Sequence, residues 1–175
     1  GPAGHVGLMP DRTRLIKWHV MGSPACNFSS VVVFPFDSRS KTCTLIQEYC
    51  PGTNSVLSGI PAGSFEPSKH EDLLAAAIME LNEEAGLKAG RFIPLAPNGI
   101  PADKYSRNRL HPYLAIDCLF DENKLPMDDT EQITVEHGVP LQEAVARLLD
   151  GDMPAPAAMT TLLAMEKLRQ MGLAD

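Results

Sequence analysis

Residues 71–87 read EDLLAAAIMELNEEAGL, and this stretch decides the predicted fold. Ser68 followed three residues later by Glu71 is a capping-box pattern, in which hydroxyl and carboxylate accept hydrogen bonds from free backbone N–H groups at a helix start. Gly86 can take the left-handed conformation that ends a helix. Together these signals predict a helix over residues 69–85. Its apolar residues recur at helical spacing and predict one buried stripe: Leu74, Ala77, Ile78, Leu81 and Ala85.

Three glutamates of the same helix, Glu80, Glu83 and Glu84, stand at positions i, i+3 and i+4. At this spacing they project together, and we expect them to point away from the apolar stripe. Their like charges repel, and no lysine lies between Asp72 and Lys88 to offset them. Hard divalent cations such as Mg²⁺ prefer carboxylate oxygens, so the pattern indicates a metal-binding face. An acidic, solvent-exposed helix turn is the alternative interpretation.

The negative charge of the chain is concentrated in two short segments. The 175 residues carry a net charge of −7, and residues 66–84 and 121–136 each hold −5. An acidic chain is a poor general binder of nucleic acid or of an anionic membrane surface, and no run of 18 apolar residues is present to span a bilayer. An anionic substrate stays compatible with this charge if metal ions lie between substrate and protein.

Apolar and β-branched runs on both sides of the helix predict a sheet within one globular domain. Residues 29–36 and 42–49 are typical of a hairpin joined by a polar turn, and the end of the chain predicts helices over 140–150 and 156–171. This order of elements favours an α/β or α+β sandwich. Further strands are predicted over residues 14–22, 56–60, 90–95, 110–119 and 131–137.

The four cysteines, Cys26, Cys43, Cys50 and Cys118, include no C-x-x-C pair, so neither a zinc knuckle nor a thioredoxin-type motif is expected. No signal peptide is visible. Free thiols predict a reducing, intracellular and most simply cytoplasmic location. The sequence begins Gly-Pro without an initiator Met, so an organelle stays open if a targeting peptide has been removed.

The helix and its flanks resemble the Nudix box, whose pattern is G-x5-E-x7-R-E-U-x-E-E-x-G-U, where U is a bulky aliphatic residue. Glu71 is followed by seven residues and then, in register, by Glu80-Leu81-x-Glu83-Glu84-x-Gly86-Leu87. Two features depart from the pattern. Seven residues instead of five separate Gly63 from Glu71, and Met79 replaces the arginine that braces the catalytic glutamates in the family. The resemblance implies a Nudix-type α/β/α sandwich with a mixed sheet.

The resemblance covers roughly residues 28–170 and is closest to the ADP-ribose and ADP-sugar pyrophosphatase branch. The segments VVVFPF, TLIQEY and PAG precede the box, and the segment from Glu131 to Ala144 follows it, much as in that branch. This implies a Nudix hydrolase domain over residues 28–175 that cleaves the pyrophosphate of a nucleoside diphosphate linked to another group, such as ADP-ribose or ADP-glucose. Cys50 and Ser58-Gly59 differ from the branch, so specificity for ADP-ribose itself does not follow.

The resemblance also implies which residues bind metal and catalyse. Glu80, Glu83 and Glu84 are the predicted ligands of Mg²⁺, with Mn²⁺ as a second option, and the backbone carbonyl of Ala62 is a further ligand. Glu83 and Glu84 are also assigned to catalysis. The general base of this branch can lie outside the box, and we predict Glu131 for that role. An ordinary acidic loop before a strand is the alternative for Glu131.

Four side chains are predicted to contact the substrate. Arg107 and Arg109 precede a strand, and a guanidinium suits phosphate oxygens, although ordinary surface cations explain the pair equally well. Tyr49 and Phe65 offer aromatic faces to a nucleobase, with core packing as the alternative for Phe65.

Residues 1–27 are predicted to form an N-terminal strand segment that contacts the partner in a homodimer, because subunits of this branch commonly pair through N-terminal strands. The predicted partners are therefore a nucleoside-diphosphate compound and a second copy of the chain, without nucleic acid or membrane. Met79 motivates an alternative function, a non-catalytic Nudix domain that binds a nucleotide or a protein partner.

Overall fold

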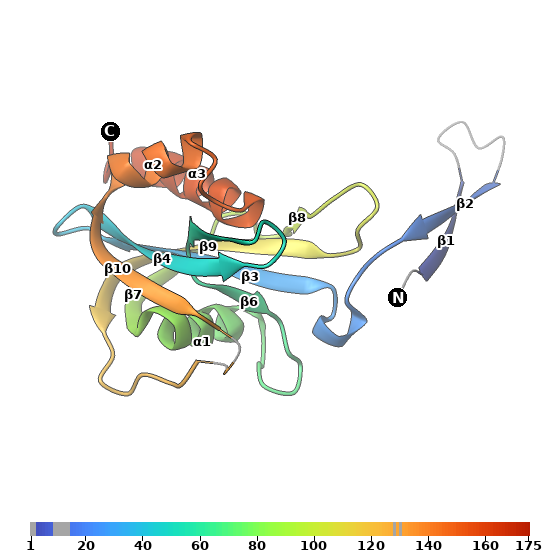
Figure 1. Cartoon of the computed structure of the whole chain (residues 1–175), viewed down its shortest axis with the longest axis horizontal. Helices are drawn as coiled ribbons and strands as arrows, with labels where there is room; N and C mark the ends of the chain where they lie inside the picture. Colours follow the sequence, from blue (N-terminus) through green and yellow to red (C-terminus); the bar gives the residue numbers. More distant parts are fainter. Residues whose placement is uncertain (1–2, 9–14, 128, 130) are drawn as a thin grey trace.

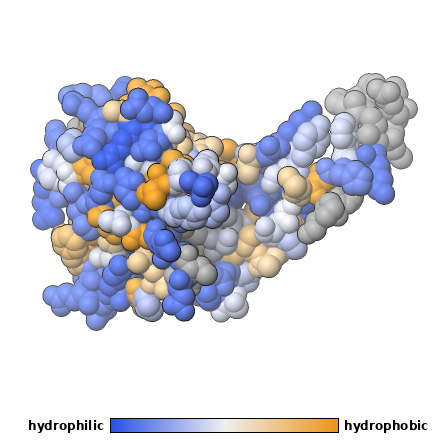
Figure 2. Space-filling model, viewed as in Figure 1, coloured by the Kyte–Doolittle hydropathy of each residue, from blue (hydrophilic) through white to orange (hydrophobic). Residues whose placement is uncertain are grey.

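An N-terminal hairpin extends as an arm from the body of the molecule (Figures 1 and 2). The computed structural model describes residues 3–8, 15–127, 129 and 131–175. The arm consists of β1 (Ala3–Leu8) and β2 (Leu15–Val20), which pair antiparallel. A short 3-10 helix, η1 (Pro24–Cys26), leads from the arm into the body.

A mixed sheet forms the centre of the body. Its strands follow the order β10 (Ile133–Pro140), β4 (Thr42–Cys50), β3 (Ser29–Asp37), β9 (Arg109–Phe120) and β7 (Leu87–Pro94). β3 and β9 are parallel, whereas the other neighbours in this order are antiparallel. Three short strands pair with this set: β5 (Ser55–Gly59) with β4, β6 (Ala62–Ser64) with β3, and β8 (Ile100–Pro101) with β9.

Helices cover both faces of the sheet (Figure 1). α1 (Leu73–Ala85) lies on one face, and α2 (Leu141–Leu149) and α3 (Ala155–Gln170) lie on the other. β3 is therefore buried over six successive residues, 31–36, as expected for a strand that is covered on both sides. The predicted α/β/α sandwich with a mixed sheet is confirmed.

Side chains of β3 alternate between two apolar cores. Val31 and Val33 face α1, where they meet Leu81 and the small side chains of the helix. Phe34 and Phe36 belong to the core beneath α3, together with Leu168. Below, we call these the α1-side core and the α3-side core. The residue contacts of each core show which face of the sheet a strand residue occupies.

A polar network fixes α2 to the sheet. The Arg147 guanidinium donates to Glu136 on β10 at 2.8 Å and to Glu143 on α2 at 2.5 Å. Gln47 of β4 donates to the same Glu136 and to Ser58 of β5. Gln47 therefore points to the α2 side of the sheet, which leaves its neighbour in the strand for the α1 side.

The start of α1 corrects the capping prediction. The helix begins at Leu73, and the side chain of Asp72 accepts a hydrogen bond from the Ala75 N–H at 2.7 Å. Ser68 lies instead in a turn over residues 67–69, which the N–H groups of Lys69 and His70 close by donating to the Glu66 carbonyl. The longer spacer of this box is absorbed in that turn. The predicted end is confirmed, with Gly86 in the left-handed region at φ 66°.

The buried face of α1 also differs from the predicted stripe. Leu74 and Ile78 are 41% and 46% exposed, so they do not belong to the core. The helix packs against both β3 and β6, and this rotates its buried face toward the glutamates. That face is made of small side chains, one leucine and two polar residues: Ala76, Ala77, Leu81, Asn82, Glu84 and Ala85. The expectation that all three glutamates point away from the core is wrong for Glu84.

The other predicted elements are found with small shifts in their ends. β6 and β8 were not predicted, because strands of three and two residues are too short to show an alternation of apolar and polar residues. β1, the partner of β2 in the arm, was not predicted either. In the part of the chain that the structure describes, no helix is both long and apolar enough to cross a bilayer.

The corrected helix start predicts the effect of two substitutions. Asp72→Ala should lower the free energy of unfolding by about 1 kcal/mol, because it removes the acceptor for a free N–H of the first turn. Asp72→Asn should restore most of that loss, since Asn caps equally well. Ser68→Ala should change it by less than about 0.5 kcal/mol. Urea unfolding of the three variants tests this, and a larger loss from Ser68→Ala would return the cap to the predicted position.

Candidate active site

The end of α1 and the strand β6 converge through two glutamates. The N–H of Ala62 donates to Oε2 of Glu84 at 3.0 Å. The carboxylate of Glu80 lies against the backbone of Gly63, where an added Cβ would stand 2.0 Å from Oε1 of Glu80. Only glycine leaves room for that carboxylate, so the Pro-Ala-Gly sequence before the box shapes the site directly.

Glu84 is a buried carboxyl group surrounded by negative charge. It is 2% exposed, and burial raises its pKa from an ordinary 4.5 to about 9. The hydrogen bond from Ala62 lowers this pKa, whereas the charges of Glu80, Glu131 and Glu48 raise it further. A carboxylate in such a field is stabilised by a cation, which offsets both the lost hydration and the repulsion.

Glu131 enters this field from a loop that α1 itself holds in place. The buried side chain of Asn82 donates to Oδ2 of Asp121 at 2.9 Å and accepts from the N–H of Leu125 at 2.7 Å. Glu131 is half-buried just before β10. The acidic segment 121–136 thus lies close to the acidic segment 66–84 in the folded chain, which the predicted role of Glu131 requires. Sequence reasoning missed the anchoring role of Asn82, which is the variable position inside the box.

Glu48 is the other residue that sequence reasoning missed. It is half-buried on β4, and its charge reaches Glu84. The predicted strand over 42–49 contained the signal for it, because Glu48 is the one charged residue in that segment. Glu83 lies half-buried beside Glu84 on α1, and Met79 is half-buried one turn earlier. The structure thus groups Glu80, Glu84, Ala62 and Glu131 of the predicted residues.

The two predicted substrate arginines lie at the base of the arm. The guanidinium of Arg107 stacks on the ring of Phe28, 4.0 Å from its centroid. Arg109 is opposite Ser29 in the parallel pairing of β9 with β3, and its guanidinium donates to the carbonyls of Asn98 and Gly99 at 3.1 Å. Both side chains are exposed, and their role in substrate binding stays a prediction.

Neither predicted aromatic residue is brought against the carboxylates. Tyr49 follows Glu48 in β4 and points to the opposite face of the sheet, where its hydroxyl donates to Asn54 at 2.8 Å. Phe65 is half-buried after β6, and its ring packs on the α1-side core and lies 5.9 Å from the ring of His70. Phe65 also lines a shallow hollow of about 410 Å³ at the start of α1.

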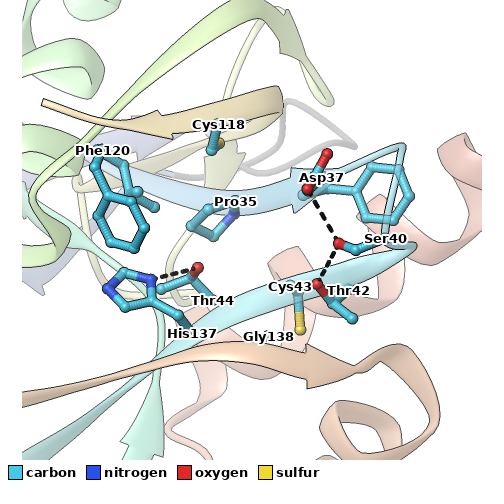
Figure 3. A pocket seen from close by; sticks show the side chains of 12 residues that line it. Pro35, Asp37, Ser40, Thr42, Cys43, Thr44, Cys118, Phe120, His137 and Gly138 are labelled. Carbon is cyan, nitrogen blue, oxygen red and sulfur yellow. Dashed lines mark hydrogen bonds between the residues drawn. The ribbon is translucent and has the colours of Figure 1, made fainter.

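A separate hollow of about 270 Å³ opens beyond the end of α1 (Figure 3). A bulge in β10 at Gly138 turns His137 toward Thr44, and Nδ1 of His137 lies 3.1 Å from the Thr44 hydroxyl. Burial raises the pKa of Cys43 and of Cys118, which also line it, to about 12, so these thiols stay protonated and weakly nucleophilic. This hollow contains none of the predicted site residues.

The cluster of glutamate carboxylates around Glu84 has the chemistry to bind a hard divalent cation. Within the described ranges, no three His, Cys, Asp or Glu side chains are already arranged as a complete metal site. Carboxylate oxygens and a backbone carbonyl are nevertheless the ligands that Mg²⁺ and Mn²⁺ prefer. The glycine that makes room for Glu80, and the wholly negative field around Glu84, fit such an ion.

Comparisons with known proteins agree with this arrangement. The family model described as NUDIX domain matches residues 27–162. Among 167 matching solved chains is one titled as the crystal structure of an ADP compounds hydrolase, with a TM-score of 0.76 and 23% identity. That match covers 98% of this chain and 87% of the other. A comparison with curated proteins gives no match.

The chain belongs to the NUDIX domain family. The family that the box predicts is confirmed, and with it the general enzyme class, the Nudix hydrolases. The solved neighbour shares the fold.

Glu84 predicts a pH-dependent stability of the metal-free protein. Because its pKa rises from 4.5 to about 9 on folding, the folded state keeps a proton that the unfolded state releases. The free energy of unfolding should therefore fall as pH rises between these values, by at most about 1.4 kcal/mol per pH unit. Urea unfolding in a chelator at pH 6 and pH 8.5 measures the slope. Glu84→Gln should reduce it and the exposed control Glu122→Gln should not, so equal slopes in all three proteins would contradict the assignment.

We predict that the substitution Gly63→Ala weakens metal binding and leaves the fold intact. In Gly63→Ala the new methyl group must displace the flexible carboxylate of Glu80, so the free energy of unfolding should change by less than about 1 kcal/mol. Stabilisation by Mn²⁺ should need at least about tenfold more metal. Gly59→Ala is the matched control, because its Cβ meets Ile46 at an ordinary 3.7 Å. Thermal unfolding with increasing Mn²⁺ is the measurement, and equal responses of both variants would refute the prediction.

Proposed function

We propose that this protein hydrolyses the pyrophosphate bond of a nucleoside diphosphate linked to another group, with a divalent metal ion, and that its substrate is an ADP-sugar such as ADP-ribose or ADP-glucose. One observation carries the proposal: the box glutamates Glu80 and Glu84 converge on the Ala62–Gly63 backbone. The substrate class is supported by the resemblance of the flanking segments to the ADP-sugar branch. A structural neighbour titled as an ADP compounds hydrolase agrees with it.

The acidic site explains why metal is needed. A pyrophosphate carries dense negative charge and would be repelled by the carboxylates of Glu80, Glu84 and Glu131. A bound Mg²⁺ or Mn²⁺ would neutralise that repulsion and lower the pKa of a water molecule. We assign its binding to Glu80, Glu83 and Glu84 with the Ala62 carbonyl.

Side chains and backbone groups of the protein are proposed to act as the general base, to orient a metal ligand and to bind the substrate. Glu131, which lies on the loop side of the site, is proposed as the base that takes a proton from the attacking water. The Ala62 N–H donates to one oxygen of Glu84 and so restricts the orientation of this carboxylate. Arg107 and Arg109 are proposed to bind phosphate or ribose oxygens, and Phe65 remains a proposed nucleobase contact. A nucleobase contact from Tyr49 would have to lie on the face of the sheet opposite to the carboxylates.

Assembly and location extend the proposal. The arm formed by β1 and β2 is proposed to contact the partner in a homodimer, since it pairs with little of its own body. An intracellular, most simply cytoplasmic location is supported by cysteines that are all free in the described structure.

Met79 supports one alternative, a Nudix domain that binds a nucleotide or a partner without turnover. In the family pattern an arginine stands at this position, and here a half-buried thioether gives the glutamates no counter-charge. This alternative predicts thermal stabilisation by nucleotides in the absence of any released nucleoside monophosphate.

A substrate panel tests both functions. The protein is incubated with ADP-ribose, ADP-glucose, UDP-glucose, NADH and FAD in the presence of Mg²⁺ or Mn²⁺, and the release of nucleoside monophosphate is measured. We expect turnover of an ADP-sugar that a chelator abolishes and that Glu84→Gln lowers by about 100-fold or more. The control Glu122→Gln should keep full activity. Stabilisation without turnover of any compound would establish the binding function instead.

A further inference from the structure

The orientation of Glu48 follows from its neighbours in β4. Cys43 and Leu45 point into the α3-side core, and Gln47 reaches Glu136 on the α2 side. Side chains of a strand alternate between its two faces, so Glu48 points to the face that α1 covers. It is half-buried there, in a part of β4 that pairs with β5 on one side and with β10 on the other.

The pairing of β4 with β10 brings Glu48 close to the loop that carries Glu131. Glu48 stands opposite Ile133, so Glu131 precedes its cross-strand neighbour by two residues. Within a sheet, residues in this diagonal relation lie about 7–8 Å apart, and Glu131 stands just before the start of β10, next to that position. On the other side, the negative charge of Glu48 acts on Glu84. Glu48 therefore lies between the box helix and the loop, on the floor of the proposed site.

The carboxylate of Glu48 is half-buried on β4. Among the residues that the structure describes, no hydrogen bond and no ion pair engages its side-chain oxygens. A half-buried carboxylate without a donor has lost part of its hydration and gained nothing in return. Such a group is stabilised when a ligand binds, and a cation is the ligand that the surrounding negative charges favour.

We infer that Glu48 is a further metal-binding carboxylate of the proposed active site and gives this centre the charge to hold a second divalent cation. The inference rests on the proposed function. Glu48, Glu80, Glu83, Glu84 and Glu131 together carry five negative charges when ionised, so one divalent ion leaves the centre strongly negative and a second removes most of the remaining charge. A pyrophosphate substrate adds further negative charge, which the second ion would offset.

A substrate-hydroxyl acceptor is the competing role for Glu48. In that role its carboxylate would bind the ribose of the substrate directly, and the binding of metal to the substrate-free protein would be unchanged. The electrostatic surroundings favour the metal role, because the charges that act on Glu84 beside it are all carboxylates.

Counting of bound Mn²⁺ in the absence of substrate tests the inference. The full chain is titrated with MnCl₂, and free Mn²⁺ is followed by electron paramagnetic resonance. We expect two ions per chain in the unmodified protein. Glu48→Gln should bind one ion, or bind the second at least about tenfold more weakly. Glu122→Gln removes the same charge from an exposed loop and should retain two ions.

The outcomes separate this inference from the proposed function. Unchanged Mn²⁺ number and affinity in Glu48→Gln overturn the inference, and if KM for the nucleotide rises at the same time, the substrate role replaces it. A protein that hydrolyses no compound of the panel refutes the proposed function, whatever Glu48 does. Glu48→Gln preserves the size of the side chain and relieves repulsion, so we expect it to fold, and a thermal unfolding curve of the metal-free variant verifies this.

Discussion

The burial of the Glu84 carboxyl group against the Ala62 N–H is the constraint on which the arrangement of the site depends. Burying a carboxylate is costly unless hydrogen bonds or opposite charge offset the loss of water. This single contact fixes the register of α1 against β6. It places Glu80, one turn earlier on the helix, against Gly63, the position of β6 that has no side chain. The face of α1 that packs in the core therefore also carries the Glu84 carboxyl group of the proposed site.

The remaining acids reach the site through tertiary structure. Glu48 is brought by the central strand β4, and Glu131 by the loop before β10, the neighbour of β4 in the sheet. Asn82 holds the preceding part of that loop on α1 through two hydrogen bonds. The net charge of −7 is thus a sum over segments that the sheet order brings together, and their proximity in space, more than the total, determines what the protein can bind.

Local patterns in the sequence predicted most of the fold. They also predicted several of the residues that the structure groups around Glu84, but not Glu48. A short stretch of sequence, one strand or one or two helical turns long, is enough to recognise each of these features: the strands around β3, the end of α1 at Gly86 and the box glutamates. The predicted stripe of Leu74 and Ile78 failed because helical spacing does not reveal which side of a helix faces the sheet. Glu48 was missed because its importance depends on pairing with β10, about 85 residues away.

The place of the arginines follows from the same sheet. Arg109 pairs with Ser29 on one edge of β3, and Gly63 pairs with Val31 on the other edge, so the two positions are about 7 Å apart along the strand and about 10 Å apart across the sheet. A ligand anchored at Glu80 would thus need to extend well beyond a single phosphate to approach the base of the arm. Because Arg109 already binds two backbone carbonyls and Arg107 stacks on Phe28, both guanidinium groups are held at that base. Any substrate contact they make must therefore use their remaining N–H groups, which favours an extended, two-part substrate over a small phosphate.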